Sequence, residues 1–127
     1  MKSFIFAIVL LLSVSLFVTL NAAKNVKSID QLLMIADRLP KNAEAFASCN
    51  GMEENVKALT DLWDKEFPSI VCTAGYENTN RCDEAIGALA VHFQNQNGAD
   101  FSVSLSEFCD ALFRLRVLEG ISLQGIF

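Results

Sequence analysis

The sequence predicts an all-α fold: a small, disulfide-stapled bundle of four to five helices with up-and-down connectivity. Apolar residues recur at helical spacing along most of the chain, and capping residues, prolines or glycines stand at the ends of these segments. No alternating run is long enough to make a sheet, since 100–105 is better explained as a loop that ends in a helix cap. The four cysteines, an even number, predict two disulfides.

The first 23 residues predict a cleaved secretory signal peptide. Lys2 gives a positive start, residues 4–20 are almost entirely apolar, and the short residues Asn21, Ala22 and Ala23 follow. No basic cluster follows the apolar run, which favours a leader over a membrane anchor. We expect cleavage after Ala22 or Ala23, secretion to the extracellular space and no stable membrane span in the mature chain. Residues 24–127 then form a single helical domain, since about 104 residues hold one core.

The charge balance limits the choice of partner. The chain has 10 Lys and Arg against 15 Asp and Glu, a net charge of −5, and loss of Lys2 with the leader leaves −6. Nucleic acids and anionic membranes need clustered basic residues, so the sequence predicts neither as a partner. It predicts another protein or a small apolar ligand.

The first predicted helix of the mature chain spans 28–39. Ser28, with Gln31 three residues later, is the pattern of a capping box, in which both side chains accept hydrogen bonds from free backbone N–H groups. Pro40 cannot continue the helix. The apolar face of this segment contains Ile29, Leu32, Leu33, Ile35, Ala36 and Leu39. A short turn or helix at 43–49 follows and ends at Asn50 and Gly51, which readily adopt positive φ.

Two further helices are predicted at 52–67 and 81–94. Pro68 ends the first of them, whose apolar face contains Val56, Leu59, Leu62, Trp63 and Phe67. The second has the apolar face Cys82, Ala85, Ile86, Leu89, Ala90 and Phe93. The last helix is predicted to begin at the cap Ser104, with Glu107 three residues later, and to end before Gly120. Residues 121–127 are apolar without a helical pattern.

Up-and-down packing predicts how the cysteines pair. Cys72 follows the helix at 52–67 and Cys82 lies in the first turn of the next, so both belong to one end of the bundle. Cys49 and Cys109 belong to the other end. The two ends of such a helix are about 24 Å apart, whereas bridged Cα atoms lie roughly 4.4–6.8 Å apart. The predicted disulfides are therefore Cys49–Cys109 and Cys72–Cys82.

No residue pattern predicts catalysis, a metal site or a cofactor. His92 is the only histidine and has no nucleophile context. The acidic pairs at 53–54 and 83–84 lie in first helical turns, where the helix dipole favours acids. A calcium loop at 95–108 fails because Phe101 stands where an EF-hand requires glycine. The sequence therefore predicts a protein that is not an enzyme.

Two functions remain for the mature chain. The leading hypothesis is a secreted, non-enzymatic binder of a macromolecular partner, such as an effector, an inhibitor, or a defence or venom component. Its interaction surface is predicted at Phe113 and Val117, which extend the apolar surface of the last helix beyond the core face. The alternative is an extracellular carrier of a small hydrophobic ligand or lipid, with a cavity lined by Trp63, Phe93, Phe108 and Leu112.

Overall fold

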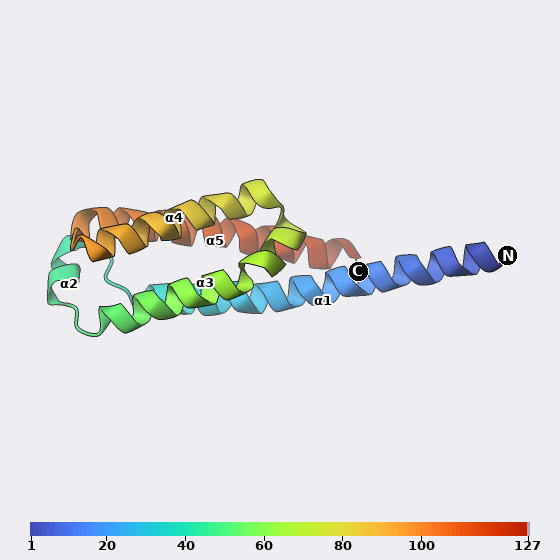
Figure 1. Ribbon diagram of the computed structural model, residues 1–127, viewed down its shortest axis with the longest axis horizontal. Coiled ribbons are helices and arrows are strands. Elements are labelled where there is room, and N and C mark those ends of the chain that lie inside the picture. Colours follow the sequence, from blue (N-terminus) through green and yellow to red (C-terminus); the bar gives the residue numbers. More distant parts are fainter. Residues whose placement is uncertain (127) are drawn as a thin grey trace.

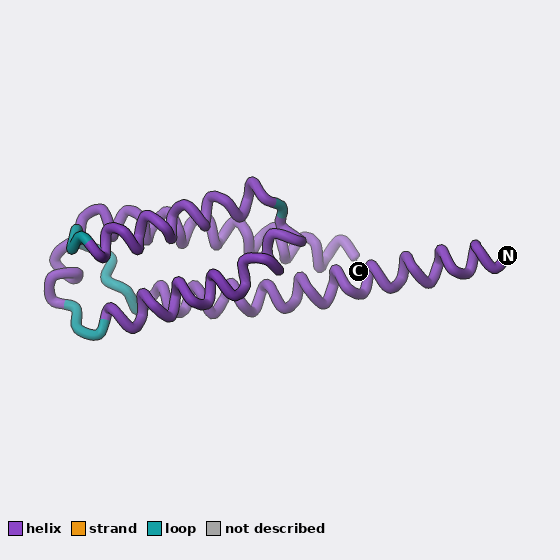
Figure 2. The backbone as a smooth tube through the Cα atoms, in the orientation of Figure 1, coloured by secondary structure: helices purple, strands orange, loops and turns teal. Residues whose placement is uncertain are grey.

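The computed structural model of the chain describes residues 1–126, with side chains as far as Ile121. Over that range the chain forms five helices and no strand, which confirms the predicted all-α class. Figure 2 shows the helices joined by short loops. They are α1 (Lys2–Asp37), α2 (Ala43–Ser48), α3 (Met52–Ala74), α4 (Tyr76–Gln94) and α5 (Gly98–Ile126).

The four long helices form an up-and-down bundle (Figure 1). Consecutive long helices run in opposite directions, and α1 and α4 each pack against both α3 and α5. The short helix α2 lies across the end of the bundle where α1 leads into α3. Asn42 caps α2, because its Oδ1 accepts a hydrogen bond from the Ala45 N–H at 2.7 Å.

Helix α1 begins much earlier than the capping box predicts. It runs unbroken from Lys2 because no glycine or proline occurs before Pro40 to interrupt it. Ser28 is therefore not a cap but a buried residue in the middle of α1, and its Oγ donates to the carbonyl of Lys24 at 3.1 Å. The predicted cleavage sites after Ala22 and Ala23 also fall within this continuous helix.

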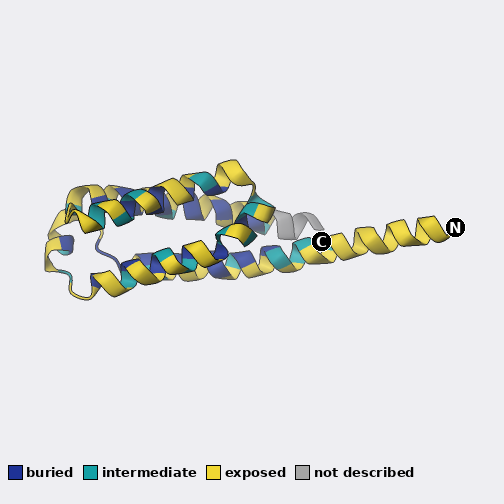
Figure 3. Ribbon diagram, in the orientation of Figure 1, coloured by how far each residue is buried: buried dark blue, intermediate teal, exposed yellow. Residues whose placement is uncertain are grey.

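The N-terminal part of α1 projects beyond the bundle. Figure 3 shows this segment exposed along its whole length, and residues 1–14 have no buried member. Helix α1 contains an 18-residue stretch that is apolar enough to cross a membrane by length and composition. The stretch lies near the N-terminus, where a signal sequence lies. The bundle proper begins near Ala22, the first fully buried residue of α1.

Pro68 does not end α3, contrary to the sequence prediction. The helix continues through it to Ala74, and α4 starts at Tyr76 rather than at Arg81. The single residue between the two helices is Gly75, whose φ of 87° lies in the region that only glycine adopts freely. The turn between these helices thus depends on one glycine.

Helix α5 also begins earlier and ends later than predicted. It starts at Gly98, where the Oδ1 of Asn97 accepts from the Asp100 N–H at 3.2 Å, so Ser104 is a buried residue inside the helix. It continues past Gly120 to Ile126. Gly98 is required by close packing, because a Cβ there would lie 2.9 Å from the Phe46 ring. The residues considered for a calcium loop are therefore mostly helical.

An aromatic cluster fills the centre of the bundle. Trp63 packs edge to face on Phe108, with ring centroids 5.8 Å apart, and Phe67 lies 5.6 Å from the same indole. The Trp63 Nε1–H donates to Asp83 Oδ1 at 2.9 Å, so the one polar atom of the ring is satisfied. Buried aliphatic residues of the long helices surround this cluster, including Ile29, Leu32, Leu59, Ile70, Leu89, Leu112 and Leu115.

The predicted disulfides are not formed, and all four cysteines are free thiols. Because α5 starts at Gly98, Cys109 lies about 16 Å along that helix from its start, whereas Cys49 lies at the end of α2. Cys72 is exposed on α3, whereas Cys82 is fully buried in α4. The pairing Cys49–Cys109 was predicted from a helix start at Ser104, whereas α5 starts at Gly98. Side-chain packing, together with hydrogen bonds between helices such as that from Trp63 to Asp83, holds the described bundle together without disulfides.

Candidate functional site

An exposed apolar strip runs along the second half of α5. It consists of Phe113, Val117, Leu118 and Ile121, of which Phe113 is 61% and Val117 55% exposed. Their spacing places them on one flank of the helix, while the opposite face is buried in the core. The structure thus places Phe113 and Val117, the residues predicted for the interaction surface, together on the outside of the bundle.

A groove between α1 and α5 lies next to Phe113. It encloses about 620 Å³, and its lining includes two exposed apolar side chains, Met34 of α1 and Phe113 of α5. We call it the α1/α5 groove. Its lining residues are Asp30, Leu33, Met34, Ala36, Asp37, Lys41, Ser102, Leu105, Ser106, Cys109 and Phe113.

The charged groups at this groove are already paired. Lys41 Nζ lies 2.7 Å from Asp37 Oδ1, and Arg116 Nε donates to Asp30 Oδ1 at 2.6 Å. The Lys41 ammonium lowers the pKa of the Asp37 carboxyl through this hydrogen bond and its charge. The apolar part of the groove is thus bordered by ion pairs in contact with water, which contribute little to stability.

A smaller hollow of about 420 Å³ lies on the other side of Phe113. It is lined by Asn78, Phe113, Arg114, Val117 and Leu118. Phe113 therefore lines two concave surfaces, and a partner that contacts it can fill either of them.

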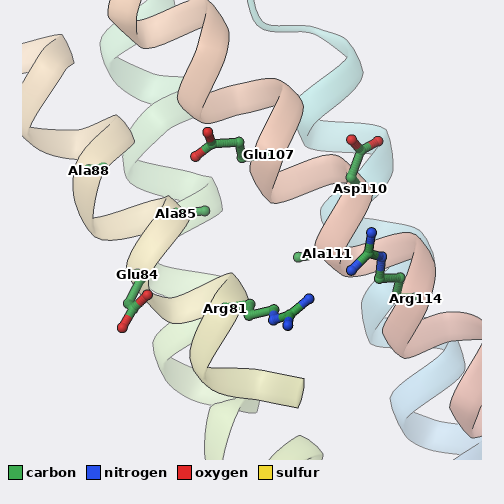
Figure 4. Close-up of a pocket in the computed structure, with 8 residues that line it drawn as sticks. All are labelled: Arg81, Glu84, Ala85, Ala88, Glu107, Asp110, Ala111 and Arg114. Atoms are coloured by element: carbon green, nitrogen blue, oxygen red, sulfur yellow. The ribbon is translucent and has the colours of Figure 1, made fainter. Parts of the chain in front are cut away.

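A third groove, of about 500 Å³, separates α4 from α5 (Figure 4). Ala85, Ala88 and Ala111 line it, and Arg81 and Arg114 point toward one another across it. Neither arginine forms an ion pair with a described side chain. The acidic residues of the groove are Glu84, Glu107 and Asp110, so this surface is polar where the strip is apolar.

The four residues predicted to line a ligand cavity are part of the packed core. Trp63, Phe108 and Leu112 are at most 1% exposed, and Phe93 is partly buried against Phe101 with ring centroids 6.4 Å apart. None of the four lines any of the three hollows described above. The structure therefore brings these residues together as interior packing.

A buried polar cluster joins three helices near the point where α1 leaves the bundle. Glu119 of α5 is 1% exposed, and its Oε1 accepts hydrogen bonds from Asn25 Nδ2 at 3.2 Å and from Thr73 Oγ1. Ser69 Oγ donates to the Oδ1 atoms of Asn25 and Asn21, at 2.9 and 2.7 Å. The second oxygen of Glu119, Oε2, is buried and has no hydrogen-bond partner among the described side chains. Burial raises the pKa of Glu119, and the bonds from Thr73 and Asn25 oppose that effect.

The sequence analysis missed this cluster, although a signal was present. Asn25 lies four residues before the buried Ile29, and Glu119 lies four residues after the buried Leu115. Extending each apolar face by one helical turn places both polar side chains on the buried side. The sequence analysis started the first of these helices too late, at Ser28, and ended the last too early, before Gly120, so neither apolar face was extended.

The remaining reactive groups are isolated. His92 is partly buried in the last turn of α4, and the described residues contain no group of three metal-ligating side chains. Burial raises the pKa of the Cys82 thiol to about 12, and the Asp83 charge adds to the effect. Burial also raises the pKa of Cys109. Neither thiol is poised to act as a nucleophile.

No protein family, no curated protein and no solved structure matches this chain.

Proposed function

We propose that this chain is an exported, non-enzymatic helical protein that binds another protein through the apolar strip of α5 and the adjoining α1/α5 groove. The observation that carries the proposal is the exposure of Phe113, which lines both the α1/α5 groove and the smaller hollow, and of Val117, which lines the smaller hollow. Clustered exposed apolar side chains beside a concave surface are typical of protein interaction sites.

The strip supports binding because nothing in the fold requires it. The buried face of α5 already supplies Phe101, Phe108 and Leu112 to the core, so the strip adds exposed apolar area without adding core packing. A partner that covers the strip removes this area from water, at roughly 25 cal/mol for each Å². An aromatic residue such as Phe113 at the centre of such a surface is a typical anchor for binding.

Export belongs to the same proposal. The exposed apolar part of α1 is the feature that supports it, because a leader of this kind directs a chain into the secretory pathway. The acidic balance of the mature chain agrees with a protein partner rather than a nucleic acid.

The test is affinity capture from the extracellular fluid of the source. Folded protein is expected to retain a stoichiometric protein partner, and the double variant Phe113→Ala, Val117→Ala is expected to lose it. Val91→Ala is the matched control, because Val91 of α4 is also about half exposed but lies outside the strip. Equal retention by all three forms would remove the strip from the proposal.

The carrier alternative is supported by one observation, the α1/α5 groove. Its volume falls in the range of about 300–1,000 Å³ that small-molecule sites occupy, and residues such as Leu33, Met34 and Phe113 give it an apolar character. A ligand would then lie in this groove and not among the four residues that were predicted to line a cavity, which are Trp63, Phe93, Phe108 and Leu112. Native mass spectrometry of protein purified from its source decides the matter, because a carrier retains a co-purifying hydrophobic mass.

A further inference from the structure

Glu119 is a buried carboxylate that faces no cation. Its two hydrogen-bond partners, Asn25 and Thr73, are neutral, and its Oε2 has no partner. A buried charge without a counter-charge is strongly unfavourable, and an unsatisfied buried oxygen calls for a specific explanation. The described side chains include no ammonium or guanidinium paired with it.

Glu66 of α3 provides a useful contrast near the same segment of α1. It is also buried, and its Oε2 also lacks a hydrogen bond. However, Lys24 Nζ lies 4.0 Å from that oxygen, so Glu66 has a cation close by. Only Glu119 lacks one.

Removal of the leader changes the surroundings of Glu119. Asn21, which bonds to Ser69, and Ala22, which is fully buried, are both lost with the leader. The new first residue is Ala23 or Lys24, both exposed, which lie two residues and one residue before Asn25. The side chain of Asn25 contacts Glu119. Cleavage hydrolyses one peptide bond, consumes one water and leaves a primary amine on the mature chain, which is protonated at neutral pH.

We propose that the α-ammonium group created by signal-peptide cleavage, one or two residues before Asn25, is the missing partner of Glu119 and docks against its Oε2. The inference rests on the proposed export, because cleavage creates the group. Processing then has a structural role beyond release of the leader: it supplies the cation that closes the buried cluster of α1, α3 and α5.

The shortened helix strengthens this arrangement. Its first four N–H groups lose their intrahelical partners, and its positive dipole end comes to lie at residues 23–26 or 24–27. An ammonium at that end is unfavourable alone, whereas a buried carboxylate beside it compensates both the ammonium and the dipole. Glu119 is 1% exposed and its side chain contacts Asn25 in this first turn, so it is placed to do so.

The test measures the α-amine of the processed protein. The full chain is produced in a secreting host, and the first residue of the recovered protein is identified by mass. Acetic anhydride then modifies the amine over a range of pH, and peptide mass gives the rate. Because the paired ammonium holds its proton, acylation near pH 7.5 is expected to be about sevenfold slower than in Glu119→Gln, as follows from a shift of about one pKa unit.

Glu66→Gln is the matched control, because it removes a second buried carboxylate next to Lys24 and leaves Glu119 in place. It is expected to keep the slow acylation of the unsubstituted protein. A processed protein whose α-amine titrates at its ordinary value of about 7.7–8.0 overturns the pairing, even if secretion is confirmed. Recovery of a chain that begins at Met1 overturns the pairing and the export proposal together. The measurement on the unsubstituted protein decides the pairing even if Glu119→Gln does not fold.

Discussion

Trp63 of α3 and Phe108 of α5 meet edge to face at the centre of the bundle, with an angle of 85° between their ring planes. Both are at most 1% exposed. This contact joins two helices that touch each other little elsewhere, because α3 and α5 lie diagonally across the bundle. The aromatic pair therefore ties the two sides of the bundle together.

Phe108→Ala is expected to lower the free energy of unfolding by about 3–5 kcal/mol, because it leaves a cavity beside the indole of Trp63. Phe113→Ala is the matched control on the same helix, since Phe113 is exposed and its loss is expected to cost about 0.5 kcal/mol or less. Urea denaturation of both variants measures the difference. Similar losses in both would contradict the assignment of Phe108 to the core.

Gly98→Ala is expected to destabilise the protein by about 1–3 kcal/mol, because the new Cβ would lie 2.9 Å from the Phe46 ring and 3.0 Å from its Cβ. Gly87→Ala is expected to have the opposite sign. Gly87 lies inside α4 with no atom within 4 Å of an added Cβ, so alanine raises stability by up to about 1 kcal/mol. Thermal unfolding of both variants checks the two signs.

The four thiols are expected to react with a thiol reagent in a fixed order. Cys72 is exposed and reacts first, whereas Cys82 is fully buried, with its pKa raised by burial to about 12, and reacts last. Cys49 and Cys109 are partly buried and fall between them. Mass mapping of the labelled peptides over time gives the order. Early labelling of Cys82, or protection of Cys72, would contradict the thiol environments described above.

In the uncleaved chain, Glu119 is expected to make stability fall as pH rises. Its pKa in the folded chain is raised above the ordinary value of 4.5 by burial, so folding favours its protonated form. The contribution of Glu119 to the free energy of unfolding is fully present below pH 4.5 and is lost as the pH rises through its raised pKa. Thermal unfolding of the full chain in detergent, with and without Glu119→Gln, isolates the effect as the difference between the two pH profiles. Parallel profiles would show that Glu119 does not titrate in this way.

Helical spacing alone was enough to predict the buried face of each long helix. Leu32, Leu59, Trp63 and Leu89 all lie in the core, because a side chain that recurs every three or four residues returns to the same side. The prediction of four to five helices agrees with the five helices that the described residues form, and Phe113 lies outside the buried face of α5.

The helix boundaries were the weaker part of the prediction. Ser28 and Ser104 each stand before an apolar run, as a cap does, but a serine inside a helix can also donate to the preceding turn, as Ser28 does. Pro68 removes one backbone donor yet stays within α3, since the rest of that helix is held by packing on α1 and α4. A capping serine or a proline in the sequence carries no information about these tertiary contacts.

The buried polar cluster was missed for a related reason. A glutamate and an asparagine are expected at the surface when each is judged by residue type, and only the packing of three helices around Glu119 and Asn25 reverses that expectation. For the predicted pair Cys49–Cys109, the start of the last helix was placed at Ser104 instead of Gly98, which put Cys109 too near the end of the bundle.

The burial of Ala22 bears on when the proposed leader can be cleaved relative to the formation of the bundle. A peptidase needs its target bond accessible and out of regular helix, yet Ala22 is 0% exposed and lies within α1 once the bundle has formed. Under the export proposal, cleavage must therefore precede the docking of this segment or wait until the segment opens. A chain that folds before it meets the peptidase would then keep its apolar N-terminal extension, so the rate of bundle assembly would set the fraction of chains that are processed.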